Sequence, residues 1–139
     1  MKTIEIKTTA RTEMVNITRE IEKVVREAGV RDGLCYVFVP HTTAGITINE
    51  NADEDVKSDI LKELGKIVPY NDGYTHIEGN SDAHIKATLT GSSVTVAVED
   101  GHLVLGTWQG IYFCEFDGPR RRKVYLKIIK DSFMDGNRF

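Results

Sequence analysis

Three of the four histidines occur in settings where an imidazole could bind a metal ion. His41, His76 and His84 fall in predicted turns or at a predicted helix start, next to asparagine, aspartate and glutamate residues. Neutral imidazole is a common zinc ligand, and three such ligands leave a fourth position for water or substrate. The sequence has no HxxxH or HExxH pair, so solvent-facing loop histidines are the alternative. We predict that folding gathers these three side chains.

A candidate carboxylate lies in the segment ITINENADED at 46–55. Alternation along a strand would turn Thr47 and Asn49 to one face, with Glu50 entering the start of the next helix. A carboxylate there can bind a divalent cation or act as a base. The acidic residues at 53–55 already have a role, because carboxylates stabilise a helix N-terminus. We therefore favour Glu50 as the functional carboxylate, with Asn49 beside it.

An aromatic residue and an amide lie between two glycines further along the chain. Trp108 and Gln109 are preceded by Gly106 and followed by Gly110. Glycines on both sides permit a bulge or a close backbone approach that could aim the indole and the amide at a ligand. A buried core tryptophan is the competing interpretation.

A basic run, PRRRK at 119–123, follows a predicted Asp-Gly turn. The guanidinium group of Arg120 could hold a phosphate through two parallel hydrogen bonds, although such a run is more often a solvated turn. The sequence has no glycine-rich phosphate loop, GxSxG motif or cysteine-centred catalytic motif. These absences disfavour nucleotide hydrolysis and serine or cysteine nucleophiles.

Helical periodicity predicts three helices that would position these residues. The first begins with Thr18 as N-cap and ends at Gly29. The second begins with Asp53 as N-cap and ends before Pro69. A short third helix has Ser81 as its cap and ends at Gly91. The stretch at 69–82, which contains His76, is rich in Gly, Asn and Asp and is predicted to be a long loop.

Apolar runs and period-2 alternation predict the strands. Asp-Gly turns are expected at 100–101 and 117–118. The predicted strands cover 2–8, 13–16, 34–40, 46–50, 93–98, 102–108, 110–116 and 122–129. Because strands and helices do not alternate regularly, the pattern predicts an α+β fold with helices packed on a largely antiparallel sheet.

The composition limits the class of protein. With 139 residues, 40% hydrophobic and 28% charged, the chain is typical of one globular domain spanning 1–139. A net charge of -3 disfavours general nucleic-acid binding. No segment has the length or apolar character of a signal peptide or membrane span. Cys35 and Cys114 lie in apolar runs, where buried thiols are expected. We expect a cytoplasmic protein.

Three motifs together resemble those of the YjbQ-like family, and the resemblance covers nearly the whole chain. They are HTTAGITINENAD at 41–53, GNSDAHIKATLTG at 79–91 and GHLVLGTWQGIYFCEFDGPRRRKV at 101–124. The family hallmark, Gly-Thr-Trp-Gln followed by a strand, occurs here at 106–109. The resemblance implies an α+β fold that assembles as a compact homotrimer.

The resemblance also implies a thiamine phosphate synthase activity, which occurs in some members as a secondary activity. In that reaction, hydroxymethylpyrimidine diphosphate loses pyrophosphate as the nitrogen of a thiazole phosphate attacks its methylene carbon. A divalent metal, zinc or magnesium, and an arginine would stabilise the leaving group. The expected site therefore binds a small phosphorylated metabolite at a subunit boundary.

The residues above receive roles under this hypothesis. Glu50 and His84 are the catalytic candidates. The substrate-binding candidates are Asn49, Trp108, Gln109 and Arg120, and the metal-binding candidates are His41, His76 and His84. One alternative is a non-catalytic trimer that binds a metal or an anionic metabolite with the same residues. Another is a structural or chaperone-like trimer without a pocket, in which the three histidines lie far apart.

Overall fold

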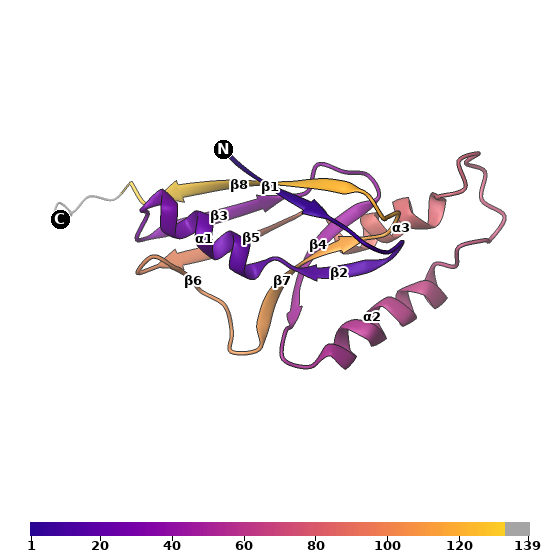
Figure 1. Ribbon diagram of the computed structural model, residues 1–139, viewed down its shortest axis with the longest axis horizontal. Helices are drawn as coiled ribbons and strands as arrows, with labels where there is room; N and C mark the ends of the chain where they lie inside the picture. Colours follow the sequence, from indigo (N-terminus) through magenta and orange to yellow (C-terminus); the bar gives the residue numbers. More distant parts are fainter. Residues whose placement is uncertain (133–139) are drawn as a thin grey trace.

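The computed structural model describes residues 1–132 and has two antiparallel sheets and three helices (Figure 1). The strand order is β1-β8-β3-β5-β6 in the larger sheet and β2-β7-β4 in the smaller one. The elements are β1 (Lys2–Lys7), β2 (Glu13–Asn16), α1 (Thr18–Ala28), β3 (Gly33–Phe38), β4 (Ala44–Glu50), α2 (Glu54–Ile67), α3 (Ser81–Thr90), β5 (Ser93–Glu99), β6 (His102–Leu103), β7 (Gln109–Glu115) and β8 (Arg121–Lys130). The predicted α+β class is confirmed. The domain predicted for 1–139 includes 133–139, which lie outside the described residues.

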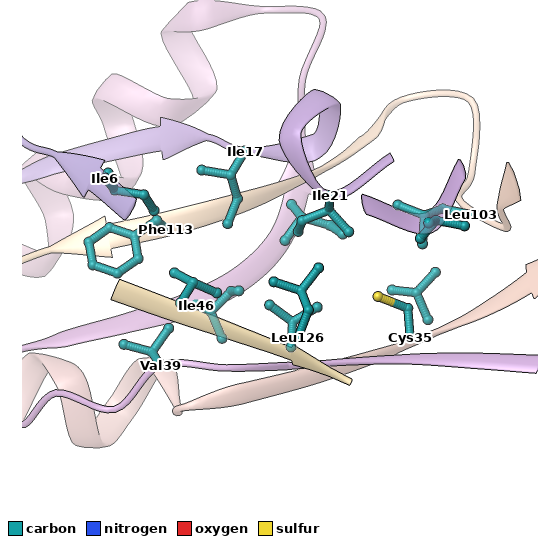
Figure 2. Packing of buried hydrophobic residues seen from close by; sticks show 14 of the residues in the cluster. Ile6, Ile17, Ile21, Cys35, Val39, Ile46, Leu103, Phe113 and Leu126 are labelled. Atoms are coloured by element: carbon teal, nitrogen blue, oxygen red, sulfur yellow. The ribbon is translucent and has the colours of Figure 1, made fainter. Parts of the chain in front are cut away.

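The main hydrophobic core lies between the two sheets and α1 (Figure 2). Phe113 from β7 and Leu126 from β8 are fully buried there, as are Ile21 and Val25 from α1. Full burial of an apolar side chain of this size contributes roughly 1.5–3 kcal/mol. Because α1 near the start of the chain and β7 and β8 near its end supply these side chains, the core holds the two sheets and α1 together.

Helix ends follow local sequence signals only in part. Gly29 ends α1 in the left-handed conformation, with φ of 69°, and Asp53 caps α2 by accepting a hydrogen bond from the Asp55 amide at 2.9 Å. The predicted cap Thr18 is wrong, because it is the first helical residue and its hydroxyl accepts a hydrogen bond from the Ile111 amide. Ser81 is likewise the first residue of α3, so it is not the cap either.

Helix α2 packs less closely than its apolar stripe predicts. None of its residues is fully buried. Ile60, Leu61 and Leu64 contact a small second cluster that includes Met14 and Phe116, and Figure 1 shows the helix at the periphery of the fold. The stripe on α2 therefore contributes little to the main core.

The Asp-Gly turn predicted at 100–101 is confirmed, although one neighbouring strand is shorter than expected. The hairpin turn predicted at 117–118 is wrong, because β7 and β8 belong to different sheets. Asp100 and Gly101 have φ of 52° and 81°, as a tight hairpin requires. The strand predicted at 102–108 is reduced to the two residues of β6. The remainder leaves the sheet and forms the connection that carries Trp108.

Both cysteines are buried and unpaired, as predicted. Burial, together with the nearby charge of Glu22, raises the pKa of the Cys35 thiol to about 11. Burial raises the pKa of the Cys114 thiol to about 12. Neither thiol is therefore an activated nucleophile. Among residues 1–132, no helix has the length and apolar character needed to cross a membrane.

Candidate functional site

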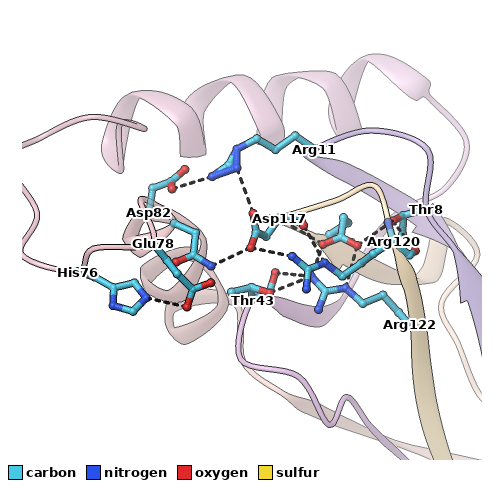
Figure 3. A network of polar contacts seen from close by, with 11 residues as sticks. Thr8, Arg11, Thr43, His76, Glu78, Asp82, Asp117, Arg120 and Arg122 are labelled. Atoms are coloured by element: carbon cyan, nitrogen blue, oxygen red, sulfur yellow. Dashed lines mark hydrogen bonds and ion pairs between the residues drawn. The ribbon is translucent and has the colours of Figure 1, made fainter.

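Two of the predicted metal ligands contact each other at the start of α3. The rings of His76 and His84 are arranged edge to face, with centroids 5.5 Å apart. His84 lies in the first turn of α3, whereas His76 belongs to the connection between α2 and α3. Glu78 lies nearby, with its Oε1 3.4 Å from His76 Nε2 (Figure 3). The long loop thus supplies His76 beside His84, and Glu78 beside His76.

His84 also borders a cavity of about 390 Å³ whose opposite wall includes His41. The cavity lies between α3 and the segment that leads into β4. A glycine permits this close packing, because a Cβ at Gly45 would lie only 2.7 Å from the Gly91 carbonyl oxygen. The remaining lining residues carry hydroxyl or small apolar groups, and no carboxylate is among them.

His41 is attached to β8 through its ring. Its Nε2 accepts a hydrogen bond of 2.9 Å from the backbone N–H of Lys123. Partial burial and the positive charge of Arg122 lower the pKa of this imidazole below its ordinary value. His41 is therefore neutral at pH 7 in the folded chain.

A buried ion pair is formed by Arg122, the residue that precedes the Lys123 amide bound by His41. Arg122, only 3% exposed, donates through Nε to Glu115 Oε1 at 2.9 Å and through Nη2 to Oε2 of the same carboxylate. Arg122 also donates to Thr43 Oγ1 at 2.9 Å, and Thr8 donates to Glu115 Oε1 at 2.8 Å. Every group in this network has a partner, which is the condition for tolerating buried charge.

A second ionic network connects the long loop and α3 to the rest of the fold (Figure 3). Arg11 donates to Asp82 at 2.9 Å and to Asp117 at 3.3 Å, and its guanidinium carbon lies 4.3 Å from the centre of the Tyr70 ring. Asp82 is 1% exposed and its other partner is Lys86, at 3.6 Å. This network holds α3, and hence His84, against the sheets.

Arg120, the predicted phosphate ligand, is already engaged. Its Nε donates to the Asp117 carbonyl oxygen and its Nη2 to Asp117 Oδ2, both at 3.0 Å. The same carboxylate accepts a hydrogen bond from Asn80, the residue before α3. The guanidinium group of Arg120 is therefore paired within the protein, and its role as a phosphate ligand stays a prediction.

The other predicted residues lie at the opposite end of β4. Glu50 pairs with Gln109 across the β4–β7 ladder, and the Asn51 amide donates to the Trp108 carbonyl oxygen at 2.8 Å. Because β4 spans seven residues, its two ends are about 20 Å apart. Glu50 is the last residue of β4, so the expectation that it enters a helix start is wrong. Asn49 borders a separate, mostly apolar cavity of about 250 Å³.

One chain therefore does not gather all predicted residues into one cleft. His41, His76 and His84 lie at one end of the smaller sheet, and the cluster around Trp108 lies at the other. In the part of the chain that the structure describes, no three His, Cys, Asp or Glu side chains are close enough together to hold one metal ion. The roles predicted for these residues stay predictions.

The charged residues that build this end of the fold were not predicted from the sequence. Glu115 lies within the apolar run IYFCEF. A charged residue in such a run indicates a buried ion pair, because charged side chains are almost never fully buried unless they are paired. Arg122 belongs to the basic run at 119–123, which was interpreted as a solvated turn or a phosphate site. Instead, it lies within β8 and points inward.

Comparisons with known proteins give a consistent result. A family profile described as "UPF0047 protein YjbQ-like" matches residues 2–131. A UPF0047 protein of Methanocaldococcus jannaschii is 58% identical over 92% of this chain and 93% of its own. A second, YugU of Bacillus subtilis, is 54% identical over 93% of this chain and 98% of its own.

Solved structures agree with the fold. A crystal structure of an uncharacterized YjbQ/UPF0047 protein from Clostridium acetobutylicum matches with a TM-score of 0.91 and 57% identity, covering 93% of this chain and all of the other. A YbjQ-like protein of unknown function from Sulfolobus solfataricus matches with a TM-score of 0.90 and 34% identity, covering 94% of this chain and 96% of its own.

These comparisons correct the expected activity. The relatives carry only family names, and the Sulfolobus protein is described as having an unknown function. None of these descriptions contains a thiamine phosphate synthase, a transferase or a step of thiamine biosynthesis. The predicted reaction is therefore wrong as a conclusion from this resemblance, and the site has to be interpreted from its own geometry.

Proposed function

The chain belongs to the YjbQ-like UPF0047 protein family, and from the geometry of its site we propose that it binds a small anionic metabolite together with a divalent metal ion. The anion occupies the cavity between His41 and His84, and the metal binds between His84 and His76. One observation carries the proposal: the ring of His84 contacts His76 and also lines the cavity. A metal there would be next to the bound anion.

The spacing of the two rings fits joint metal binding. Two imidazoles on one tetrahedral zinc ion, with bonds of about 2.0 Å, place their ring centres about 5 Å apart. The 5.5 Å between His76 and His84 is close to that value. Two histidines leave coordination positions for the anion, and Glu78, which contacts His76, is a further oxygen donor in this segment. When bound, the metal would polarise the anionic group.

The charges around the cavity nearly balance. The adjoining networks contain four basic side chains, Arg11, Lys86, Arg120 and Arg122, and three carboxylates, Asp82, Glu115 and Asp117. These seven side chains sum to one positive charge, which Glu78 beside His76 offsets, and no carboxylate lines the cavity. A bound metal ion would add the positive charge that favours a phosphate or carboxylate group there.

Zinc titration of protein purified without an affinity tag tests the metal component. His84→Ala and His76→Ala are each expected to weaken zinc binding by at least about tenfold, because loss of a direct ligand costs no less than loss of a group that only orients one. The matched control is His102→Ala, which alters an exposed histidine next to Glu22 on another face. Isothermal titration calorimetry measures all four proteins. Equal zinc affinity in all of them would rule out the histidine pair as the metal site.

We further propose that the chain assembles as a homotrimer in which Trp108 is covered by a neighbouring subunit. Trp108 is 63% exposed, yet the loop that carries it is held firmly. The Gly106 amide donates to Gln109 Oε1 at 2.8 Å, and the Asn51 amide donates to the Trp108 carbonyl oxygen. Tryptophan is one of the residue types enriched among the energetically dominant residues near the centre of protein interfaces.

Light scattering tests this assembly. The expected mass is three times the chain mass of 15.6 kDa, and Trp108→Ala is expected to shift the population to the mass of a single chain at micromolar concentration. Far-UV circular dichroism establishes that the variant is folded. A monomeric mass for the unaltered protein would refute the trimer, and a trimeric Trp108→Ala variant would refute the role of the indole.

The free, buried cysteines support a reducing compartment. We accordingly propose a cytoplasmic location, which fractionation of cells carrying the natural protein would test.

A further inference from the structure

The hydrogen bond between His41 and β8 determines which ring nitrogen carries the proton. A backbone amide can only donate, so His41 Nε2, which accepts from the Lys123 N–H at 2.9 Å, must present its lone pair there. In a neutral imidazole the proton then lies on Nδ1. A neutral histidine binds a metal through its lone pair, and the lone pair of His41 is already in use.

One contact holds the His41 ring and a second holds the backbone two residues further on. Its acceptor contact is to Lys123, and the side chain of the preceding residue, Arg122, binds the Thr43 hydroxyl at 2.9 Å and the Thr43 carbonyl oxygen at 3.2 Å. Thr43 follows His41 by two residues, so both the ring and its backbone are attached to β8. The bidentate contact with buried Glu115 fixes Arg122 in turn. A donor held in this way binds without reorganisation.

The cavity beside His41 is suited to an oxygen anion. Thr42 and Ser92 contribute hydroxyl groups to its wall, and no carboxylate competes for the donors. The nearby charges of Arg122 and Arg120 oppose protonation of His41 and attract negative charge. His41 therefore remains a neutral donor rather than a cation that would pair with any carboxylate nearby.

We infer that His41 donates its Nδ1–H to the oxyanion of the bound metabolite, a phosphate or a carboxylate group, and is not a ligand of the metal. This inference rests on the proposed anion site and assigns His41 a part different from that of His76 and His84. It also explains why three histidines at one end of the fold do not form a three-ligand metal site.

The tautomer is measurable without any ligand. Long-range proton–nitrogen correlation spectra of the ¹⁵N-labelled protein distinguish a protonated ring nitrogen from one that carries a lone pair. His41 is expected to show a protonated Nδ1 and an unprotonated Nε2, and His41→Ala identifies its signals. The opposite tautomer, or rapid exchange between the two, would overturn the inference.

Two amide variants separate the two ring positions. His41→Asn places an amide near the position of Nδ1, where it can still donate to an anion. His41→Gln places an amide near the position of Nε2, where it can accept from Lys123 but leaves no donor at Nδ1. Titration with inorganic phosphate, and separately with acetate, is expected to show about tenfold weaker binding for His41→Gln. His41→Asn is expected to stay within about threefold.

The outcomes distinguish this inference from the proposed function. Tighter binding of inorganic phosphate indicates a phosphorylated metabolite, and tighter binding of acetate indicates a carboxylate. Zinc affinity is expected to be unchanged in both variants. A loss of zinc affinity as large as that of His84→Ala would overturn the role inferred for His41 but not the proposed function. Normal binding of both anions by His41→Gln, together with weakened binding by His41→Asn, would also overturn the inference. If neither anion binds the unaltered protein although His41 has the expected tautomer, the proposed anion site is wrong.

Discussion

Replacing Arg122 with alanine is expected to lower the free energy of unfolding by about 3–5 kcal/mol. The change leaves the Glu115 carboxylate, which is fully buried, without its bidentate partner. Thr8 and the Asp117 amide still donate to it, but neither carries a charge. Urea unfolding measures the loss, and Arg121→Ala, an exposed neighbour on the same strand, is expected to change stability by no more than about 0.5 kcal/mol.

A double variant shows whether the unpaired charge causes this loss. Glu115→Gln in the Arg122→Met background removes both charges and retains an acceptor for Thr8. Because an uncompensated buried charge costs more than a neutral pair, the double variant is expected to recover at least half of the lost stability. If the double variant is less stable than Arg122→Ala, the stability of this region does not depend on charge pairing.

The same ion pair predicts a dependence of stability on pH. Burial alone would raise the pKa of Glu115, but hydrogen bonds from Arg122, Asp117 and Thr8 hold it below its ordinary value. A carboxyl whose pKa is lower in the folded than in the unfolded chain stabilises the fold above the unfolded pKa, about 4.3. That contribution disappears as the pH falls through the folded pKa. In Arg122→Ala the pKa of Glu115 is no longer held down, so the stability deficit of this variant should shrink as the pH falls below about 4.3, measured by urea unfolding at a series of pH values.

Replacing Arg11 with alanine is expected to have the second largest effect, a loss of about 3 kcal/mol. Arg11 bridges Asp82 and Asp117 and covers Tyr70. Without it, buried Asp82 keeps only Lys86, at 3.6 Å. About a third of the Arg11 side chain is exposed, which places the estimate at the low end for a buried pair. Arg31→Ala, which breaks an exposed ion pair with Asp100, is the matched control.

Loss of Arg11 should also reduce the order of the segment that carries the proposed metal ligand His76. The segment 69–80 is attached to the fold through Tyr70 and Asn80, so its amides should exchange hydrogen faster in Arg11→Ala. Zinc affinity should fall with it, because His76 belongs to this segment. Asp82→Asn in the Arg11→Ala background should restore part of the stability by removing the unpaired charge. A full additive loss in that double variant would contradict the explanation.

Much of the fold follows from local patterns. The alternation in β1, the helical spacing in α1 and the Asp-Gly turn at 100–101 specify their elements, because each depends on residues within a few positions of one another. Caps were predicted less well. Thr18 and Ser81 have the right chemistry for a cap, but Thr18 accepts from Ile111 in a strand 93 residues away. Tertiary contacts therefore decide what such a side chain does.

Short motifs were enough to indicate the family, periodicity was enough to predict the α+β class, and the residue types available for chemistry can be read directly from the chain. Which of these residues meet depends on tertiary packing. His41 contacts a backbone amide 82 positions away, and Arg11 contacts a carboxylate 71 positions away. Glu50 and Trp108 are carried to the far end of β4 by the strand ladder. No local pattern encodes these distances, because packing of the two sheets against each other and against α1 sets them.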